Sequence, residues 1–267
     1  MNFDLVLVTL TYRNDKDLTD FLDSLASLGC SYRVIVVNSF YDNESESAIR
    51  SVAQAYGCDF FSVENKGYGS GNNAGIRFAL EHYQFQYLAV SNPDIRIGEF
   101  DLDRLTAAEN AVVGPKILTL RGKNQNPIHY RRNFFVLFFR FLYAKAGFLP
   151  FFLAAILFNK LEKAVLRKGD AKGPRQVYAL HGSFFLLPRS VLQTFGGKLF
   201  DERMFLFCEE NHIAELARKH GVPIIYDPRF WVTHKEDGSI SLENLDHFRI
   251  TRESLKVFFE NWKLFHR

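Results

Sequence analysis

The first 95 residues alternate between short apolar runs and amphipathic stretches, and this alternation constrains the fold more than any other feature of the sequence. Residues 5–10 are apolar and β-rich, as expected for a strand buried on both faces. Residues 17–28 place leucine and phenylalanine at helical spacing, and Gly29 follows as a helix stop. The same pattern then repeats, which is typical of a mostly parallel sheet covered by helices on both faces. Further strands are expected at 33–37, 59–63 and 86–91, with helices after residue 47 and over 73–83.

The second half of the chain is less regular. Strand-like runs at 177–180 and 184–187 flank the tripeptide His181-Gly182-Ser183. A helix is expected over 209–220, a strand over 223–226 that leads to 231–234, and an amphipathic helix over about 243–265.

Composition excludes several classes of protein. Hydrophobic residues make up 47% of the 267 residues, enough for a real core, and a formal net charge of only +3 gives no reason to expect a nucleic-acid partner. The three cysteines are far apart, so we expect reduced thiols in a cytoplasmic protein. The N-terminal residues resemble a first strand rather than a signal peptide, and no apolar stretch is long enough to span a bilayer.

Polar loops follow the expected strands and predict one ligand site. Residues 11–14, 38–45, 65–72 and 92–94 all come at the carboxyl ends of strands, where ligands of such sheets bind. The third loop has four glycines within residues 67–75 and leads into a helix, so it can approach an anion closely or simply form a flexible turn. It follows the third strand rather than the first, which does not fit a dinucleotide-binding fingerprint.

Four acidic or imidazole side chains are candidates for chemistry. Asp94, in Asn92-Pro93-Asp94, can hold Mg²⁺ or Mn²⁺ against a diphosphate, although this tripeptide is also good β-turn chemistry. Glu209 and Glu210 begin a helix, where adjacent carboxylates can form a general base or merely complement the helix dipole. His234 ends a strand-like run and can bind metal or phosphate, or act only as a hydrogen-bonding residue.

The ordered set of these motifs resembles the family-2 glycosyltransferases, and in particular bacterial rhamnosyltransferase-like members that carry Asn-Pro-Asp in place of Asp-x-Asp. The likeness covers nearly the whole chain outside 120–175. The segments that carry the likeness are residues 8–12, 36–39, 65–76, 91–94, 182–189, 197–202, 205–210 and 231–234.

This resemblance implies a GT-A fold, an α/β architecture with a mostly parallel mixed sheet flanked by helices. It implies an inverting transfer of a sugar, in particular rhamnose from dTDP-rhamnose, to a glycan or polyprenyl-linked acceptor in bacterial cell-surface polysaccharide synthesis. UDP-hexose and UDP-galactofuranose are alternative donors. The expected organisation is a nucleotide-sugar-binding half (1–120), an insertion (121–175), an acceptor half (176–242) and a C-terminal helix (243–267).

The resemblance also implies roles for individual residues. Glu210 would be the base, with Glu209 close by, and Asp94 and His234 would bind Mg²⁺ or Mn²⁺. The implied donor-binding residues are Thr11, Tyr12, Asn38, Asp42, Asn65, Gly67, Gly69, Asn73, Asn92 and Asp94.

Three positions depart from the family pattern. Asn38 stands where the family usually has Asp, and its carbonyl oxygen can still accept a hydrogen bond from a pyrimidine. Asp42 lies in residues 39–43, which match the family's usual acidic run only in part. His212 replaces an Asp that often follows the Glu-Asp pair, which leaves open which of the two glutamates is the base.

A basic, phenylalanine-rich segment separates the two halves. Residues 131–175 hold ten Lys or Arg and two Asp or Glu, a net charge of +8. Basic amphipathic segments with aromatic faces lie at the surface of anionic membranes. We therefore expect peripheral attachment to the inner face of the cell membrane through 131–175, with a buried helical subdomain or a dimer interface as the alternative.

Two other functions fit parts of the pattern. The altered 38–43 run suggests a catalytically inactive subunit that binds sugar nucleotide or glycan. A nucleotidyltransferase has a similar sheet, but such enzymes usually carry a glycine-rich basic loop after the first strand, where this chain has Thr9-Leu10-Thr11-Tyr12-Arg13.

Overall fold

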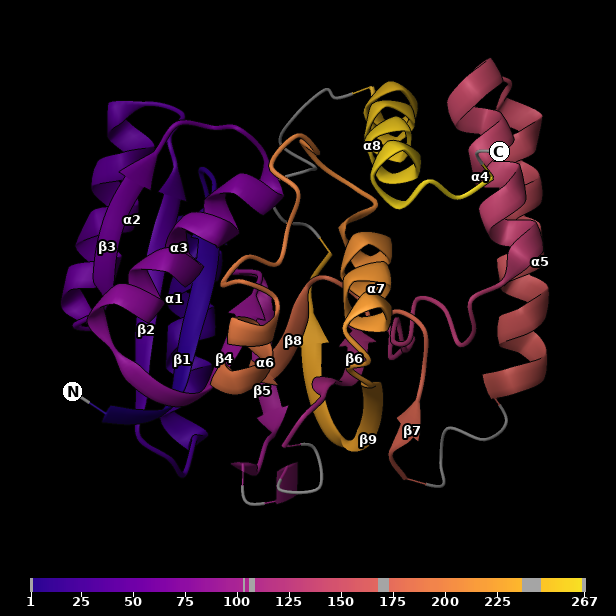
Figure 1. Cartoon of the computed structure of the whole chain (residues 1–267). Helices are drawn as coiled ribbons and strands as arrows, with labels where there is room; N and C mark the ends of the chain where they lie inside the picture. The colour runs from indigo at the N-terminus through magenta and orange to yellow at the C-terminus, as the bar shows by residue number, and fades with distance from the viewer. Residues whose placement is uncertain (1, 103, 106–108, 168–172, 237–245, 266–267) are drawn as a thin grey trace.

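The computed structural model describes residues 2–102, 104–105, 109–167, 173–236 and 246–265. Nine strands among these residues form one sheet in the order β3-β2-β1-β4-β8-β6-β9-β5, with β7 paired to β9 (Figure 1). The strands are β1 (Asn2–Thr11), β2 (Tyr32–Ser39), β3 (Asp59–Val63), β4 (Gln84–Ser91), β5 (Ile95–Glu99), β6 (Val112–Thr119), β7 (Arg175–Gln176), β8 (Phe184–Pro188) and β9 (Ile224–His234). The helices are α1 (Asp15–Ser24), the 3₁₀ turn η1 (Leu25–Ser27), α2 (Asn43–Ala55), α3 (Tyr68–His82), α4 (Phe134–Ala146), α5 (Leu149–Leu166), α6 (Arg189–Thr194), α7 (Glu209–Lys219) and α8 (His247–Trp262).

The sheet is mixed, and its parallel part lies in the N-terminal half. Strands β1, β2, β3 and β4 run parallel to one another. Strand β8 is antiparallel to β4, and it is followed by β6, β9 and β5, which add one further parallel and two further antiparallel pairings. The expected α/β fold with a mostly parallel mixed sheet is therefore confirmed.

The two faces of the sheet are buried in separate cores, as alternation along β1 shows. Leu5 and Leu7 join a core with Phe21 of α1 and with α2, whereas Val6 and Val8 join a core with α3, α6 and α7. All five side chains are buried. Because successive residues of a strand face opposite sides, a run of apolar residues is what a strand covered on both faces requires. Each such burial contributes at most about 1.5–3 kcal/mol.

Helix α3 begins at Tyr68, five residues before the expected start at 73, so most of the glycine-rich segment is helical rather than loop. Its glycines lie against the sheet. A Cβ atom on Gly71 would come within 2.4 Å of Leu10 Cδ1, and one on Gly75 within 2.4 Å of Val8 Cγ1. These glycines therefore allow close packing of the helix on β1, whatever their role toward a ligand.

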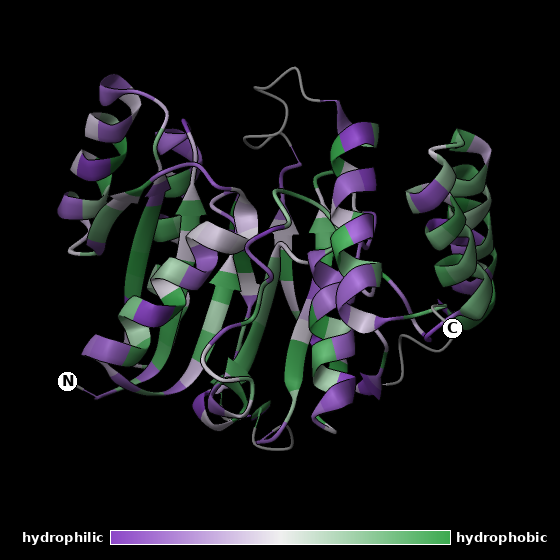
Figure 2. Ribbon diagram, turned by 45° about the horizontal axis from the view of Figure 1, so that its top comes forward, coloured by the Kyte–Doolittle hydropathy of each residue, from purple (hydrophilic) through white to green (hydrophobic). Residues whose placement is uncertain are grey.

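The basic, phenylalanine-rich segment forms a helical hairpin of α4 and α5, joined at Gly147, which has a φ of 68°. The hairpin lies at one side of the molecule beside α8 (Figure 1), and most of its residues are hydrophobic (Figure 2). Helices α4 and α8 share a third, smaller core that includes Tyr143 and Phe258. In the part of the chain that the structure describes, no helix has both the length and the apolar composition to cross a membrane.

Two expected elements differ in extent. Residues 177–180 are not a regular strand, because Tyr178 and Ala179 bond to the backbone of His129 and Tyr130 in an isolated bridge. The C-terminal helix is shorter than expected: α8 spans His247–Trp262, and residues 243–245 lie outside the described ranges.

Candidate active site

A cavity of about 470 Å³ opens at the edge of the sheet where β1, β2 and β4 end. Strand β8 runs the other way and begins at this edge, since Ser91 pairs with Phe184 and the Asn92 N–H donates to the Ser183 carbonyl at 2.8 Å. Several chain segments thus meet around one space. It is lined by Leu10, Tyr12, Ser39, Asn65, Gly67, Tyr68, Asn92, Pro93, Asp94, His181, Gly182, Ser183, Phe205, Leu206, Phe207, Glu209, Glu210, His234 and Glu236.

Two carboxylates begin α7 on the wall of this cavity. The residues before them, Phe207 and Cys208, have φ angles of 70° and 72°. Left-handed backbone costs a residue with a side chain about 1–2 kcal/mol, and such strain clusters at functional sites. Here it turns the chain sharply so that Glu209 and Glu210 both reach the cavity.

The two glutamates differ in their exposure. Glu209 is only 6% exposed, and its Oε1 has no hydrogen-bond partner among the described residues, whereas Glu210 is half-buried. Burial raises the pKa of Glu209, and the charge of Glu210 raises it further. Burial also raises the pKa of Glu210, opposed by backbone N–H groups and by the charge of Arg140. A carboxylate with a raised pKa is a better proton acceptor near neutral pH than an ordinary one.

Tyr68 and Gly182 form the part of the cavity wall next to Glu210 and are hydrogen-bonded to each other. The Tyr68 hydroxyl donates to the Gly182 carbonyl at 2.9 Å, and the Tyr68 N–H donates to the Phe205 carbonyl at 2.8 Å. A Cβ atom on Gly182 would lie 3.2 Å from Glu210 Oε1. Burial raises the pKa of Tyr68, so its hydroxyl stays protonated and remains a donor.

Asp94 and His234 form a buried pair on the wall of the same cavity. Asp94 Oδ2 lies 3.2 Å from His234 Nε2, and the side chains are 5% and 10% exposed. His234 Nδ1 lies 2.8 Å from Gln125 Oε1, and Gln125 Nε2 donates to Glu236 at 2.8 Å. Because Glu236 fixes the amide orientation, the Gln125 oxygen faces Nδ1, which must then carry a proton. With a proton on Nδ1 alone, the ring would present an Nε2 lone pair to the carboxylate, and a cation bound between these two acceptors would satisfy both.

The donor set fits a hard divalent cation. Asp94 supplies a carboxylate and His234 an imidazole nitrogen, and the nearby Asn92 Oδ1 is buried without a partner among the described residues. No group of three His, Cys, Asp or Glu side chains that could hold a metal occurs in the described ranges. Two protein ligands suffice for Mg²⁺, which usually takes its other ligands from water and substrate phosphates.

The helical hairpin contacts the start of α7 through Arg140. Its guanidinium Nη1 donates to Asn211 Oδ1, directly after Glu210, and its Nε is buried without a partner in the described part of the chain. A positive charge from α4 thus lies close to the candidate base, although α4 belongs to a segment outside the sequence motifs.

The cavity brings together most of the residues that the motifs single out. Of the expected donor-binding residues, Tyr12, Asn65, Gly67, Asn92 and Asp94 line it, as do Glu209, Glu210 and His234.

Other expected donor-binding residues lie behind the cavity or outside it. The Thr11 hydroxyl donates to the Val37 carbonyl at 3.2 Å, and the Asp42 carboxylate caps α2 by accepting from the Ser45 N–H at 2.8 Å. Gly69 packs on Phe200.

Asn73 has a structural position. Its amide nitrogen donates to the Phe200 carbonyl at 2.9 Å, and its oxygen accepts from the Leu199 and Phe200 N–H groups. Asn38 is also buried behind the cavity, where Nδ2 donates to Ser62 Oγ at 3.1 Å and Oδ1 has no described partner.

Sequence reasoning assigns no role to Tyr68 or His181, and the structure places both on the cavity wall. The His181 ring lies 5.5 Å from that of His234, and its Nδ1 lies 2.9 Å from Ser183 Oγ. Burial lowers the pKa of His181 to about 3, with a further lowering by His234, so it is neutral. Its one sequence signal is its place between two strand-like runs. Tyr68 falls within residues 65–72, a segment expected at this edge, but nothing in the sequence singles out its hydroxyl.

Sequence comparison finds related proteins with named activities. No family model matches the chain. It is 24% identical over 228 residues to the low-salt glycan biosynthesis hexosyltransferase Agl10 of Haloferax volcanii, a match that covers 83% of this chain but only 64% of that protein. It is also 24% identical over 235 residues to the rhamnosyltransferase WbbL of Escherichia coli K12, covering 85% of this chain and 82% of that one.

The fold matches solved glycosyltransferases as well. The structure of GalNAc-T7 with UDP, GalNAc and Mn²⁺ superposes with a TM-score of 0.63 over 98% of this chain and 50% of that chain, at 11% identity. At that identity the likeness concerns the fold alone, and the two sequence relatives, both named as glycosyltransferases, are 24% identical to this chain. Together the comparisons support a family-2 glycosyltransferase. The chain thus carries its paired carboxylates and its Asp94–His234 pair in one cavity of a GT-A fold.

Proposed function

We propose that this glycosyltransferase moves a sugar, with inversion, from a nucleotide diphosphate donor to an acceptor hydroxyl in the cavity at the sheet edge. The observation that carries the proposal is that one cavity holds a half-buried carboxylate, Glu210, and a buried Asp94–His234 pair. Inversion needs a base on one side of the sugar and a cationic site for the departing diphosphate on the other. These two groups supply both.

In the proposed mechanism, Glu210 accepts the proton of the acceptor hydroxyl as that oxygen attacks the anomeric carbon. Burial and the charge of Glu210 raise the pKa of Glu209, so Glu209 remains protonated beside the ionised base, and the Tyr68–Gly182 contact keeps the facing wall in place. Asp94 and His234, with the Asn92 amide oxygen, would hold Mg²⁺ or Mn²⁺, which when bound neutralises charge on the leaving diphosphate. The named GalNAc-T7 structure, with its UDP and Mn²⁺, supports this choice of ion.

The nucleotide base is proposed to bind at the ends of β1 and β2. Tyr12 and Ser39 line that part of the cavity, and the unpartnered Asn38 oxygen can accept a hydrogen bond from a pyrimidine N–H. Uracil and thymine both carry that N–H, so Asn38 does not distinguish them. The WbbL relative favours dTDP-rhamnose, and the hexosyltransferase relative together with the UDP of GalNAc-T7 favours a UDP-hexose.

A panel of donors tests the activity. The matching donor, at 100 times its Kd with Mn²⁺, stabilises the fold by about 2.7 kcal/mol. For a protein of this size we expect that to raise the Tm by about 5–10 °C in a thermal-shift measurement. The same donor should be hydrolysed slowly to free nucleotide. A donor that binds with Mn²⁺ but never releases nucleotide, with or without candidate acceptors, would instead indicate a binding subunit.

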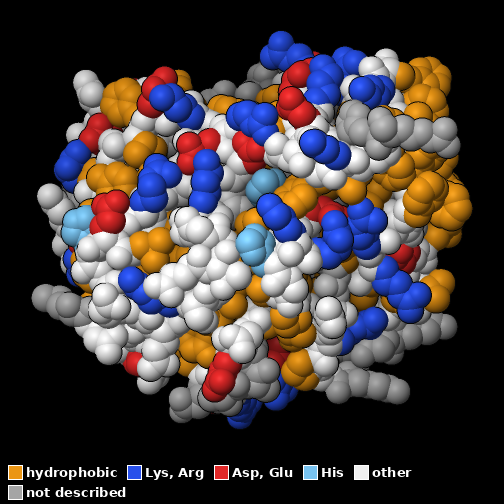
Figure 3. Space-filling view, viewed as in Figure 1, with side chains coloured by type: hydrophobic (Ala, Val, Ile, Leu, Met, Phe, Trp, Pro, Cys, Tyr) orange, Lys and Arg blue, Asp and Glu red, His pale blue; other side chains and the backbone are white. Residues whose placement is uncertain are grey.

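We further propose that the acceptor is a glycan or lipid-linked glycan reached at an anionic membrane surface through the α4–α5 hairpin. Helix α5 exposes an apolar residue at every fourth position, and Figure 3 shows hydrophobic side chains gathered over this side of the molecule. Hydrophobic stripes on basic helices bind the interface of anionic bilayers. The exposed stripe consists of Leu149, Leu153, Leu157, Leu161 and Val165.

Vesicle co-sedimentation tests this surface. Leu153, Leu157 and Leu161 are 53–56% exposed, so changing all three to Ser should weaken binding to anionic vesicles by more than about tenfold without unfolding the protein. Phe151 and Phe152 are unsuitable targets, since both pack against the core that α4 shares with α8.

The matched control is Leu120→Ser, which removes an exposed leucine outside the hairpin and should leave vesicle binding unchanged. If the triple variant binds vesicles as well as the original chain does, the stripe is not a membrane surface. The same conclusion follows if the original chain is a dimer and the triple variant is a monomer with unchanged vesicle binding.

A further inference from the structure

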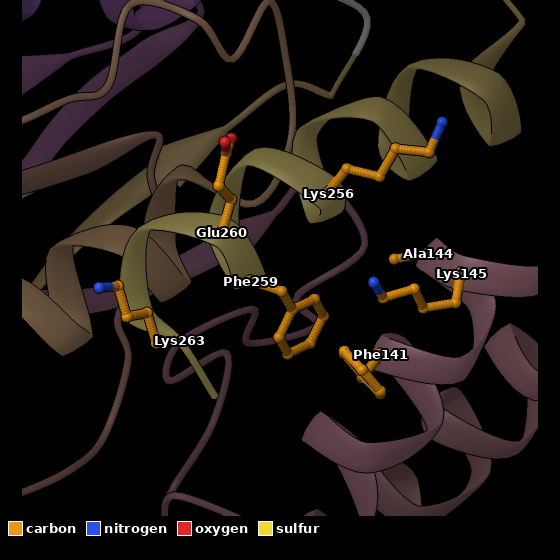
Figure 4. Close-up of a pocket in the computed structure, with 7 residues that line it drawn as sticks. All are labelled: Phe141, Ala144, Lys145, Lys256, Phe259, Glu260 and Lys263. Carbon is orange, nitrogen blue, oxygen red and sulfur yellow. The ribbon is translucent and has the colours of Figure 1, made fainter. Parts of the chain in front are cut away.

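A second cavity, of about 590 Å³, lies between α4 and α8, apart from the residues of the active-site cavity. We call it the α4–α8 groove. The facing sides of the two helices form it, because its α4 residues are spaced by three and four positions and its α8 residues likewise (Figure 4). The groove is lined by Phe141, Ala144, Lys145, Lys256, Phe259, Glu260 and Lys263.

The floor of the groove is aromatic. Phe141 and Phe259 face each other from the two helices, with ring centroids 5.3 Å apart and an interplanar angle of 80°. Ala144 lies next to them on α4 and leaves space above the rings (Figure 4). Such a floor favours a ligand with an apolar portion over a bare, strongly hydrated ion.

The rim of the groove is basic. Lys145 extends from α4 into the space between the helices, with its ammonium 5.7 Å from the centre of the Phe141 ring (Figure 4). Lys145 and Lys263 have no ion pair with any residue that the structure describes, whereas Lys256 pairs with Glu253 at 2.7 Å. Figure 4 shows the Lys145 ammonium directed into the space and Lys263 pointing away on the other side of Phe259, so Lys145 is the lysine that faces a bound anion.

The acidic side chain on the rim does not neutralise these lysines. Glu260 is directed toward Arg203, with Oε2 3.3 Å from Nη1, so its charge already has a partner. With three lysines and one paired glutamate, the groove has a net positive charge.

The groove also lies beside the surface proposed for the membrane. Lys145 precedes by three residues Phe148, which is 57% exposed at the turn between α4 and α5. The exposed stripe of α5 begins with the next residue, Leu149. A molecule held at Lys145 can therefore keep its apolar part against the membrane side of the hairpin.

We propose that the α4–α8 groove binds the phosphate headgroup of an anionic membrane lipid, with the first methylenes of its chains on the Phe141–Phe259 floor. This site rests on the membrane part of the proposed function and deepens it. The stripe on α5 provides contact with any bilayer, and the groove provides selectivity for anionic lipid.

Binding of a soluble short-chain lipid tests the groove without a membrane. We expect dihexanoyl phosphatidylglycerol, below its micelle concentration, to bind in calorimetry, and dihexanoyl phosphatidylcholine and inorganic phosphate to bind much more weakly. The variant Lys145→Gln should lose about fivefold in affinity, since each basic residue near an anionic lipid surface is worth about a factor of five. The control Lys16→Gln/Lys219→Gln, which removes two exposed lysines from α1 and α7, should lose less than about twofold.

The outcomes separate the groove from the other proposals. Equal binding of inorganic phosphate would show a simple anion site, and equal binding of phosphatidylcholine would show a purely apolar one; either result overturns the proposal. An unchanged affinity in the lysine variant does the same, even if vesicle binding through α5 holds. If the short-chain lipid binds and vesicles do not, the groove stands and the membrane surface on α5 fails. Donor hydrolysis by the lysine variant should stay at the original rate, because Lys145 does not line the active-site cavity.

Discussion

Replacing Glu210 with Gln is expected to reduce kcat for sugar transfer by about 10²–10⁴-fold, the usual contribution of a general base. Gln keeps the size of the side chain and its contact with Gly182 but cannot accept the proton of the acceptor hydroxyl. Donor affinity should change little, because the donor is proposed to bind mainly at Asp94, His234 and the ends of β1 and β2. Single-turnover transfer, with donor Kd measured by thermal shift, checks both parts.

Glu209→Gln is the matched control for this experiment. Glu209 is 6% exposed and Glu210 is half-buried, so the acceptor can approach Glu210 more readily. We expect Glu209→Gln to lose less than about tenfold in kcat. A loss of several hundredfold in Glu209→Gln, with near-normal rates in Glu210→Gln, would exchange the two roles.

The pH dependence follows from the same pair and belongs to the same experiment. Burial raises the pKa of Glu210, so the base becomes protonated at a higher pH than an exposed glutamate would. The rate should therefore fall as pH decreases through this raised pKa. Since burial and the charge of Glu210 hold the pKa of Glu209 up as well, Glu209 stays protonated and neutral while Glu210 titrates, so Glu209→Gln should leave the acidic limb of the kcat profile nearly unchanged.

The strands of the N-terminal half could be predicted from sequence because burial on both faces leaves a simple pattern. Residues 33–37 and 86–91 are apolar runs, and both lie within strands, β2 and β4. The glycine-rich segment was harder, since glycine disfavours helix locally. Gly71 and Gly75 are helical because tertiary packing on β1 outweighs that preference. Residues 177–180 have an apolar pattern, but their partner at residue 129 lies in an irregular segment that no periodicity reveals.

The residues of the candidate site could be predicted only where they belong to motifs whose order along the chain matches the family. Asp94, Glu210 and His234 come from different segments, and the order of the motifs was enough to associate them. The segment 65–72 could be expected at the site, but the contact of the Tyr68 hydroxyl with Gly182 could not be predicted, because it depends on where α3 begins. Arg140 lies in a segment without motifs and reaches Asn211 only through the packing of α4 beside α7 and α8. Contacts of this kind depend on tertiary structure and leave no local signal in the chain.

Replacing Asp94 with Ala is expected to lower transfer by about 10³-fold or more, because stabilisation of the leaving diphosphate by a bound metal is worth several kcal/mol. Asp94 is the carboxylate of the proposed metal site, and without it His234 Nε2 loses the partner that lies 3.2 Å away. Asp94→Asn provides the sharper comparison, since the amide keeps the shape and removes only the charge. Both variants should also lose donor-dependent Mn²⁺ binding, measured by electron paramagnetic resonance with the donor nucleotide present. The fold should persist, because the backbone contact from the Lys235 N–H to the Asp94 carbonyl does not involve the side chain. If Asp94→Asn binds Mn²⁺ as the original chain does and retains its rate, the cation lies elsewhere and the Asp94–His234 pair is only a structural contact.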